Sequence, residues 1–200
     1  TSAGRRYYRL VDRWLLPLAV RLGLTPNQAT LTGLAVAFLV PAGYFFHPLA
    51  GAGLILLSGL ADSLDGLLAR SRGRLSIGGA FLDSCVDRVS DSLYLMGIWV
   101  LFLPDHYPLA ASMMMAACLT STFLISYTKA RAESLGASLA GGLMERAARI
   151  VYLLVWTLVL AVVPAQEGTI LWAGALLYFF LTAGTAGRRV ILAQKQLAGS

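Results

Sequence analysis

Charged residues are scarce in this sequence, making up only 13% of its 200 residues. Soluble domains carry about 25% charged residues, so this composition argues against a soluble protein. Cysteine is equally rare: Cys85 and Cys118 are the two examples, and both fall in apolar stretches, which argues against a disulfide framework. We find no internal repeat, heptad pattern or low-complexity tract. We also find no long apolar run that leads to a small-residue cleavage site, and therefore expect no signal peptide.

Long apolar stretches are what the sequence has instead. Hydrophobic residues make up 58% of the chain, and the mean hydropathy is +0.71. A helix needs about 20 mostly apolar residues to cross the hydrocarbon core of a membrane. We therefore predict an all-α integral membrane protein with a bundle of six transmembrane helices over residues 25–192, in one domain that covers residues 1–200. The six stretches are residues 29–46, 50–69, 79–103, 107–131, 146–164 and 168–190.

The first 24 residues have a different pattern, in which apolar residues recur at intervals of three and four among several arginines. This periodicity is typical of a helix with one apolar face, and the arginines suit a membrane surface. We predict an amphipathic juxtamembrane helix over residues 1–24, ended by the break at Thr25-Pro26-Asn27. Its apolar positions are Tyr7, Leu10, Val11, Trp14, Leu15, Leu18 and Leu22.

The basic residues follow the membrane topology that these stretches predict. Short turns at residues 47–48, 104–108 and 164–168 would share one side, and all 16 lysines and arginines lie elsewhere. The positive-inside rule then places both termini and the loops near 70–78 and 133–143 in the cytoplasm. The net charge of +6 therefore reflects insertion in the cytoplasmic membrane, and we expect no nucleic-acid partner.

Aspartates occur at membrane depth in the second and third stretches. Asp62 and Asp65 lie on the second, while Asp83, Asp87 and Asp91 follow one face of the third at four-residue intervals. A carboxylate near the bilayer centre costs about 2.5 to 3.5 kcal/mol, so such a group needs compensation. Carboxylate oxygens are the ligands that Mg²⁺ and Mn²⁺ prefer, which favours a metal site.

Two alternatives to a metal-dependent enzyme remain open at this point. Nearby arginines at positions 70, 72, 74 and 88 could make the acids into structural ion pairs. Acidic residues inside six spans also occur in cation transporters.

The spacing of these residues resembles a known signature. From Asp62 to Asp87 the chain follows D-x-x-D-G-x-x-A-R-x8-G-x-x-x-D-x-x-x-D, and it matches all eight fixed positions. This is similar to the CDP-alcohol phosphatidyltransferases. The resemblance implies transfer of a phosphatidyl group from CDP-diacylglycerol to a polar alcohol, with release of CMP. It also implies six spans, an active site that opens to the cytoplasm, and a homodimer.

The resemblance assigns roles to individual residues. Two divalent ions, Mg²⁺ or Mn²⁺, would be held by Asp62, Asp65, Asp83 and Asp87, and Asp87 would also be the catalytic base. Asp91 lies outside the signature, and we interpret it as a supporting or structural residue. Ser76 stands where close relatives have threonine, which keeps a hydroxyl. The implied CDP-lipid contacts are Asn27, Thr30, Asp65, Gly66, Ala69, Arg70, Ser76 and Gly79.

A second group of basic residues bears on the acceptor. The sequence around residues 126–133 and 144–149 resembles the phosphatidylinositol phosphate synthases of actinobacteria, whose acceptor is an inositol phosphate. Arginine forks suit phosphate oxygens. Glycerol 3-phosphate is an alternative acceptor, and anchoring of helix ends to anionic lipid is an alternative role for the cations. The implied acceptor-phosphate residues are Lys129, Arg131, Arg146, Arg149 and Arg189.

Overall fold

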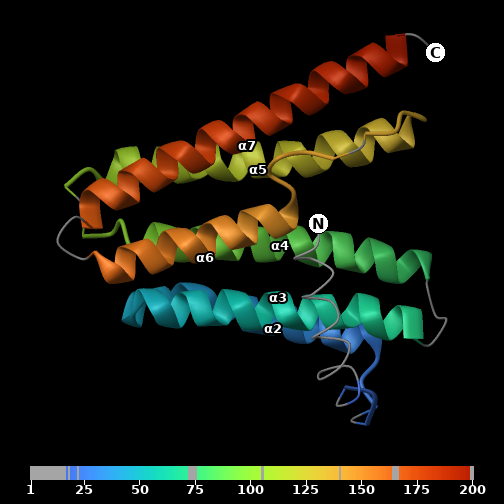
Figure 1. Cartoon of the computed structure of the whole chain (residues 1–200), viewed down its shortest axis with the longest axis horizontal. Coiled ribbons are helices and arrows are strands. Elements are labelled where there is room, and N and C mark those ends of the chain that lie inside the picture. Colours follow the sequence, from blue (N-terminus) through green and yellow to red (C-terminus); the bar gives the residue numbers. More distant parts are fainter. Residues whose placement is uncertain are drawn as a thin grey trace.

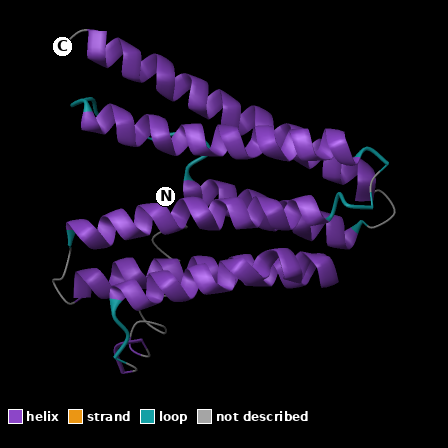
Figure 2. Ribbon diagram, turned by 180° about the vertical axis from the view of Figure 1, so that it is seen from behind, coloured by secondary structure: helices purple, strands orange, loops and turns teal. Residues whose placement is uncertain are grey.

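The computed structural model describes residues 17, 19–21, 23–71, 76–104, 106–139, 141–163 and 167–198. Within these ranges the protein is all-helical and contains no strand, as Figure 2 shows. Most of the predicted amphipathic helix at 1–24 lies outside the described residues. The long helices are α2 (Pro26–Phe46), α3 (Pro48–Ser71), α4 (Ile77–Val100), α5 (Pro108–Ser134), α6 (Arg146–Val162) and α7 (Glu167–Ala198).

Four of the described helices are long and apolar enough to cross a membrane: α2, α3, α5 and the part of α7 at Gly168–Ala198. They indicate a multi-pass membrane protein. The other two differ for identifiable reasons. α4 has 24 residues but carries three aspartates and an arginine, and α6 has only 17 residues, about 26 Å of helix.

Proline and hydroxyl caps fix where several helices begin. Thr25 caps α2 through a reciprocal pair of hydrogen bonds with Gln28, and Pro26 occupies the first turn. The Ser76 hydroxyl caps α4 by accepting the Gly79 N–H at 2.9 Å. A Cβ at Gly79 would lie 2.9 Å from this oxygen, so the glycine leaves room for the cap.

The helices pack lengthwise in neighbouring pairs (Figure 1). α2 packs against α3 and α4, and α5 packs against α7. α6 begins near the middle of the molecule and contacts both α3 and α7. The aspartate-bearing parts of α3 and α4 are therefore next to the first turn of α6.

A buried tyrosine of α2 joins α3, α4 and α6 at the end of the bundle away from the aspartates. Tyr44 is 2% exposed, and its hydroxyl shares a 2.6 Å hydrogen bond with Thr157 of α6. A Cβ at Gly51 would lie 2.2 Å from its ring, and one at Gly97 would lie 2.6 Å from it. Glycine at both positions thus allows the ring to fit between α3 and α4, and the threonine satisfies its polar group.

The segment between α5 and α6 runs back along the bundle (Figure 1). Near its start, Ser138 exchanges two 3.0 Å hydrogen bonds with the side-chain amide of Gln196 on α7. Ala137 and Leu139 pack against Ala193 of α7 in a small apolar cluster. These contacts hold the segment against the last part of α7.

Candidate active site

Three of the predicted metal ligands meet between α3 and α4. Asp62, Asp83 and Asp87 each offer one carboxylate oxygen, and the three oxygens lie within 4.8 Å of one another. All three residues are partly buried. Asp83 and Asp87 are one turn apart on α4, and therefore they face the same point on α3. The sequence pattern anticipated this convergence.

Arg146, the first residue of α6, contacts this cluster. Its Nη1 donates a hydrogen bond to Asp62 Oδ2 and lies 2.5 Å from Asp87 Oδ1. Arg88 is 3.4 Å from the other oxygen of Asp87. The contact between Arg146 and Asp87 Oδ1 is an ion pair that lacks hydrogen-bond geometry, so this buried oxygen has no hydrogen-bond partner.

These residues fit a hard divalent cation. Three carboxylates face two guanidinium groups in the described part of the chain, so the acids outnumber their basic contacts. An oxygen-only donor set of this kind suits Mg²⁺ or Mn²⁺. The buried Asp87 Oδ1 has the capacity to accept a further electrostatic partner.

Asp65 lies outside the group of three. It is 9% exposed, and its Oδ2 accepts a 2.5 Å hydrogen bond from the Thr30 hydroxyl of α2. The first helix of the bundle therefore orients the fourth predicted metal ligand. Sequence reasoning placed Thr30 with the lipid substrate and missed this contact, since nothing in the local pattern relates two residues 35 positions apart.

A cavity of about 700 Å³ adjoins the carboxylates between α2, α3 and the start of α4. Seven of the eight predicted CDP-lipid residues line it. The exception is Arg70, whose exposed side chain lies beside the cavity, with Nη1 3.4 Å from where a Cβ of Gly66 would be. The lining residues are Thr25, Pro26, Asn27, Thr30, Asp65, Gly66, Ala69, Ser76, Gly79, Ala80 and Asp83.

Two of the five predicted acceptor residues are buried and engaged by protein groups. Arg149 is 2% exposed and donates to Asp91 Oδ2 at 2.6 Å and to the Met144 carbonyl at 2.9 Å. Arg189 is 5% exposed and donates to the Ile125 carbonyl at 2.8 Å.

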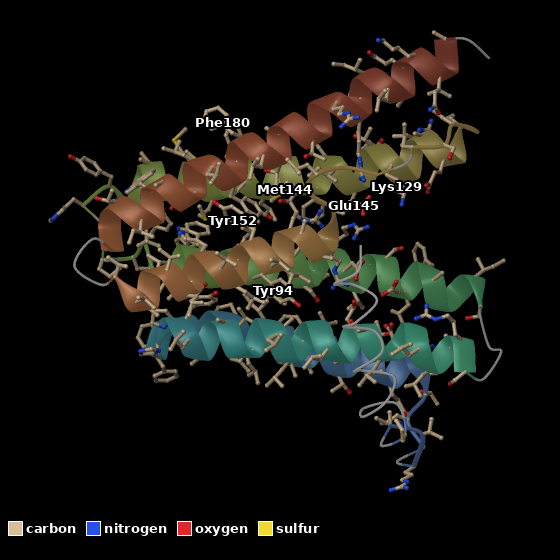
Figure 3. All side chains as sticks on the ribbon, viewed as in Figure 1. Tyr94, Lys129, Met144, Glu145, Tyr152 and Phe180 are labelled. Atoms are coloured by element: carbon tan, nitrogen blue, oxygen red, sulfur yellow. The ribbon has the colours of Figure 1, made fainter. Side chains whose placement is uncertain are left out.

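The remaining acceptor candidates have other surroundings. Lys129 and Arg131 are exposed on α5, and Lys129 lies 3.9 Å from Glu133. Arg189 also lies 3.5 Å from Glu145, a residue that sequence reasoning did not single out. Figure 3 labels Glu145 and Lys129 in the region where α5 meets the start of α6. Arg189 thus reaches the start of α6 through Glu145, while Arg146 alone among the predicted acceptor residues contacts the carboxylate cluster in the described structure.

Residues 23–180 match the family model of the CDP-alcohol phosphatidyltransferases. The chain belongs to this family. It is therefore an enzyme of phosphatidyl transfer, as the aspartate signature predicted, and the alternative of a cation transporter loses its support.

Individual relatives agree with the family assignment. The chain is 39% identical over 158 residues to an archaetidylinositol phosphate synthase of Methanothermobacter thermautotrophicus, covering 78% of each protein. It is 37% identical over 158 residues to the phosphatidylinositol phosphate synthase of Mycolicibacterium smegmatis, covering 76% of this chain and 69% of the relative. The resemblance to phosphatidylinositol phosphate synthases, predicted from the sequence, is thus confirmed.

Solved structures show the same fold. The phosphatidylinositol phosphate synthase of Mycobacterium tuberculosis with CDP-DAG bound superposes with a TM-score of 0.76 at 29% identity, covering 92% of this chain and 94% of the other. The same enzyme in complex with manganese and citrate gives a TM-score of 0.75 at 29% identity, covering 90% and 87%.

Proposed function

We propose that this enzyme transfers the phosphatidyl group of CDP-diacylglycerol to a hydroxyl of an inositol phosphate. In this reaction the acceptor oxygen bonds to the phosphorus of the phosphatidyl group, the pyrophosphate bond breaks, and CMP leaves. The observation that carries the proposal is the convergence of Asp62, Asp83 and Asp87 beside a cavity of about 700 Å³.

Asp62, Asp65, Asp83 and Asp87 would hold two divalent ions, Mg²⁺ or Mn²⁺. When bound, such ions neutralise the pyrophosphate and the developing charge on the leaving phosphate. Thr30 fixes the orientation of Asp65 through its hydrogen bond, which limits how far that carboxylate can turn away from the site.

Asp87 would act as the base. An alcohol is a poor nucleophile until its proton is accepted, and a carboxylate at the reacting hydroxyl can take that proton. Asp87 is suited to this role because its carboxylate lies beside those of Asp62 and Asp83, and Arg146 contacts its Oδ1. The proton of the acceptor hydroxyl would move to this oxygen as the new bond to phosphorus forms.

The CDP moiety would occupy the 700 Å³ cavity. Its polar wall carries the Asn27 amide and the Ser76 and Thr30 hydroxyls, while Gly66, Ala69 and Gly79 keep the wall low enough for a nucleotide to approach the helices. The exposed Arg70 at its edge would contact phosphate oxygens.

The acceptor phosphate would lie where the start of α6 meets α5 and α7. Lys129 and Arg131 are exposed on α5 and would contact the phosphate first. Arg146 would direct the acceptor to Asp87, which it already contacts, and the buried Arg149 and Arg189 would add positive potential. The similarity to an archaetidylinositol phosphate synthase and a phosphatidylinositol phosphate synthase supports this acceptor over glycerol 3-phosphate.

The same proposal includes the membrane arrangement. All six helices would span the cytoplasmic membrane, α4 with its aspartates facing the bundle interior and the short α6 ending within one interface. The termini and the carboxylate cluster would face the cytoplasm, and the enzyme would be a homodimer.

The deciding experiment measures CMP release by the purified enzyme with CDP-diacylglycerol and Mn²⁺ or Mg²⁺. Four acceptors are compared in one preparation: inositol phosphate, glycerol 3-phosphate, inositol and serine. We expect the highest kcat/KM with inositol phosphate. A higher value with glycerol 3-phosphate would reassign the acceptor, and the absence of CMP with all four would overturn the proposed function.

A further inference from the structure

A second cavity, of about 250 Å³, lies between α7 and the segment that leads into α6. It shares no lining residue with the larger cavity beside the aspartates. Residues of two kinds line it: Arg188 and Arg189 are basic, whereas Leu143, Phe180 and Leu192 are apolar. The cavity therefore has a basic end and an apolar wall.

Arg189 gives the basic end an unused hydrogen-bond donor. Its Nη1 donates to the Ile125 carbonyl and its Nη2 lies 3.5 Å from Glu145, but its buried Nε has no hydrogen-bond partner. This Nε is 3.4 Å from where a Cβ of Gly142 would be, and Gly142 lines the cavity. A buried donor without a partner costs free energy that a bound anion would recover.

Arg188 adds an exposed positive charge at the same end. It lies 21 residues after Glu167, the first residue of α7. At 1.5 Å per residue this separation is about 32 Å, close to the thickness of the hydrocarbon core. With the start of α7 at one membrane surface, the arginine pair would lie at the level of the lipid headgroups of the other.

The apolar wall extends from this level into the membrane. Phe180 precedes Arg188 by eight residues, about 12 Å deeper along the helix, and is 66% exposed. Leu143, in the segment that leads into α6, also lines the cavity and is 68% exposed. Phe180 stands clear of the ribbon of α7 in Figure 3. A ligand here would meet cations at headgroup level and apolar side chains at acyl-chain level.

We propose that this cavity binds one anionic phospholipid of the surrounding bilayer. Its phosphate lies against Arg188 and the Nε of Arg189, and an acyl chain lies along Leu143 and Phe180. The cavity shares no lining residue with the substrate cavity. Arg189 belongs to both regions: its Nε lies beside Gly142 of this cavity, whereas its Nη atoms reach Ile125 and Glu145 near the proposed acceptor phosphate.

Two glycines on α7 provide a matched test. A Cβ at Gly184 and one at Gly187 would each meet nothing within 4 Å, and both residues are exposed. Gly184 lines the cavity, whereas Gly187 does not. Gly184→Leu therefore fills the cavity, and Gly187→Leu makes the same change in composition without filling it. Lys195→Gln, exposed and two turns further along α7, is the charge control for Arg188→Gln.

The measurement is native mass spectrometry of the full chain released from detergent that contains phosphatidylglycerol or phosphatidylcholine. We expect wild type, Gly187→Leu and Lys195→Gln to retain phosphatidylglycerol in preference to phosphatidylcholine. Arg188→Gln should weaken that retention about fivefold, because one arginine near an anionic lipid surface contributes about that factor to binding. Gly184→Leu should abolish it, while both glycine variants keep wild-type CMP release as the check on folding.

Three results would overturn the proposal. Full retention of phosphatidylglycerol by Gly184→Leu would show that the lipid binds elsewhere. Displacement of the lipid by CDP with Mn²⁺, or by inositol phosphate, would place it in the substrate site. Displacement by inorganic phosphate alone would show that the arginines bind a free anion and that the apolar wall contributes nothing.

Discussion

Arg149 donates a 2.6 Å hydrogen bond to Asp91, and the two side chains are only 3% and 5% exposed. The pair joins α6 to α4 one turn beyond the residues of each helix that meet at the carboxylate cluster, Arg146 and Asp87. Removal of one partner would leave the other as a buried charge without compensation. This explains why an aspartate outside the family signature lies on the same helix face as those within it.

Asp91→Ala should therefore destabilise the protein by about 3 to 5 kcal/mol, the usual cost of breaking a buried pair. The change is measured as a lower Tm in detergent. The double variant Asp91→Leu with Arg149→Met removes both charges and should recover much of that loss. An unchanged Tm for Asp91→Ala would mean that water compensates Arg149 and that the pair does not hold the helices together.

Asp87→Asn should lower CMP release by about 10²- to 10⁴-fold, because an amide cannot take the proton of the acceptor hydroxyl. Binding of CDP-diacylglycerol, measured by titration calorimetry, should change little. Cys85→Ser, two residues earlier on α4 and exposed, is the control and should behave as wild type. Turnover by Asp87→Asn at the wild-type rate would remove this residue as the base.

Thr30→Val deletes the hydroxyl that bonds to Asp65 and keeps the shape of the side chain. Loss of a partner that orients a metal ligand typically costs 10- to 100-fold in metal affinity or activity, and we expect a fall of about this size. Thr32→Val is a close control, since Thr32 is exposed and its hydroxyl donates to the Gln28 carbonyl within the same helix. The Mn²⁺ concentration for half-maximal activity is the readout, and equal values for the two variants would contradict the role of Thr30.

Gly79→Ala should weaken CDP-lipid binding, whereas Gly78→Ala should not. A Cβ at Gly79 would lie 2.9 Å from the Ser76 oxygen, but a Cβ at Gly78 would meet nothing within 4 Å. The first change disturbs the cap of α4, which is worth about 1 kcal/mol, and the cavity wall beside it. KM for CDP-diacylglycerol distinguishes the two, and an equal shift in both variants would contradict the role of Gly79.

Arg146→Ala should raise the KM for inositol phosphate about tenfold or more, the loss expected for a charged hydrogen bond. It also removes a positive charge from Asp62 and Asp87, so the Mn²⁺ requirement should stay the same or fall. This combination separates an acceptor residue from one that merely supports the metal ligands. A higher Mn²⁺ requirement with an unchanged acceptor KM would contradict it.

The sequence was sufficient to predict the aspartate cluster, because helical spacing places Asp83 above Asp87 and the signature fixes their distance from Asp62. The cavity residues followed from the family resemblance, and seven of them line one wall. The positions of the aspartates follow from spacing within α4 and from the signature that joins α3 to α4, while the roles of the metal and lipid residues stay predictions.

Contacts between distant helices could not be predicted in the same way. The Thr30–Asp65 and Asp91–Arg149 pairs join residues 35 and 58 positions apart, and each depends on how two helices rotate against each other. The length of α7 was also underestimated: the apolar stretch ends at residue 190, but the helix continues to Ala198. A helix can continue past its apolar stretch with polar residues, so the end of the apolar stretch does not mark the end of the helix.

The close fit of Tyr44 between Gly51 and Gly97 has a bearing on the carboxylates at the opposite end of the bundle. Gly97 lies ten residues from Asp87, about 15 Å along a nearly rigid helix. A larger residue at position 97 would push α4 outward at that end and tilt it, which would carry Asp83 and Asp87 away from their partner on α3. The separation of the acids therefore depends in part on Gly51 and Gly97, two glycines far from the substrate cavity.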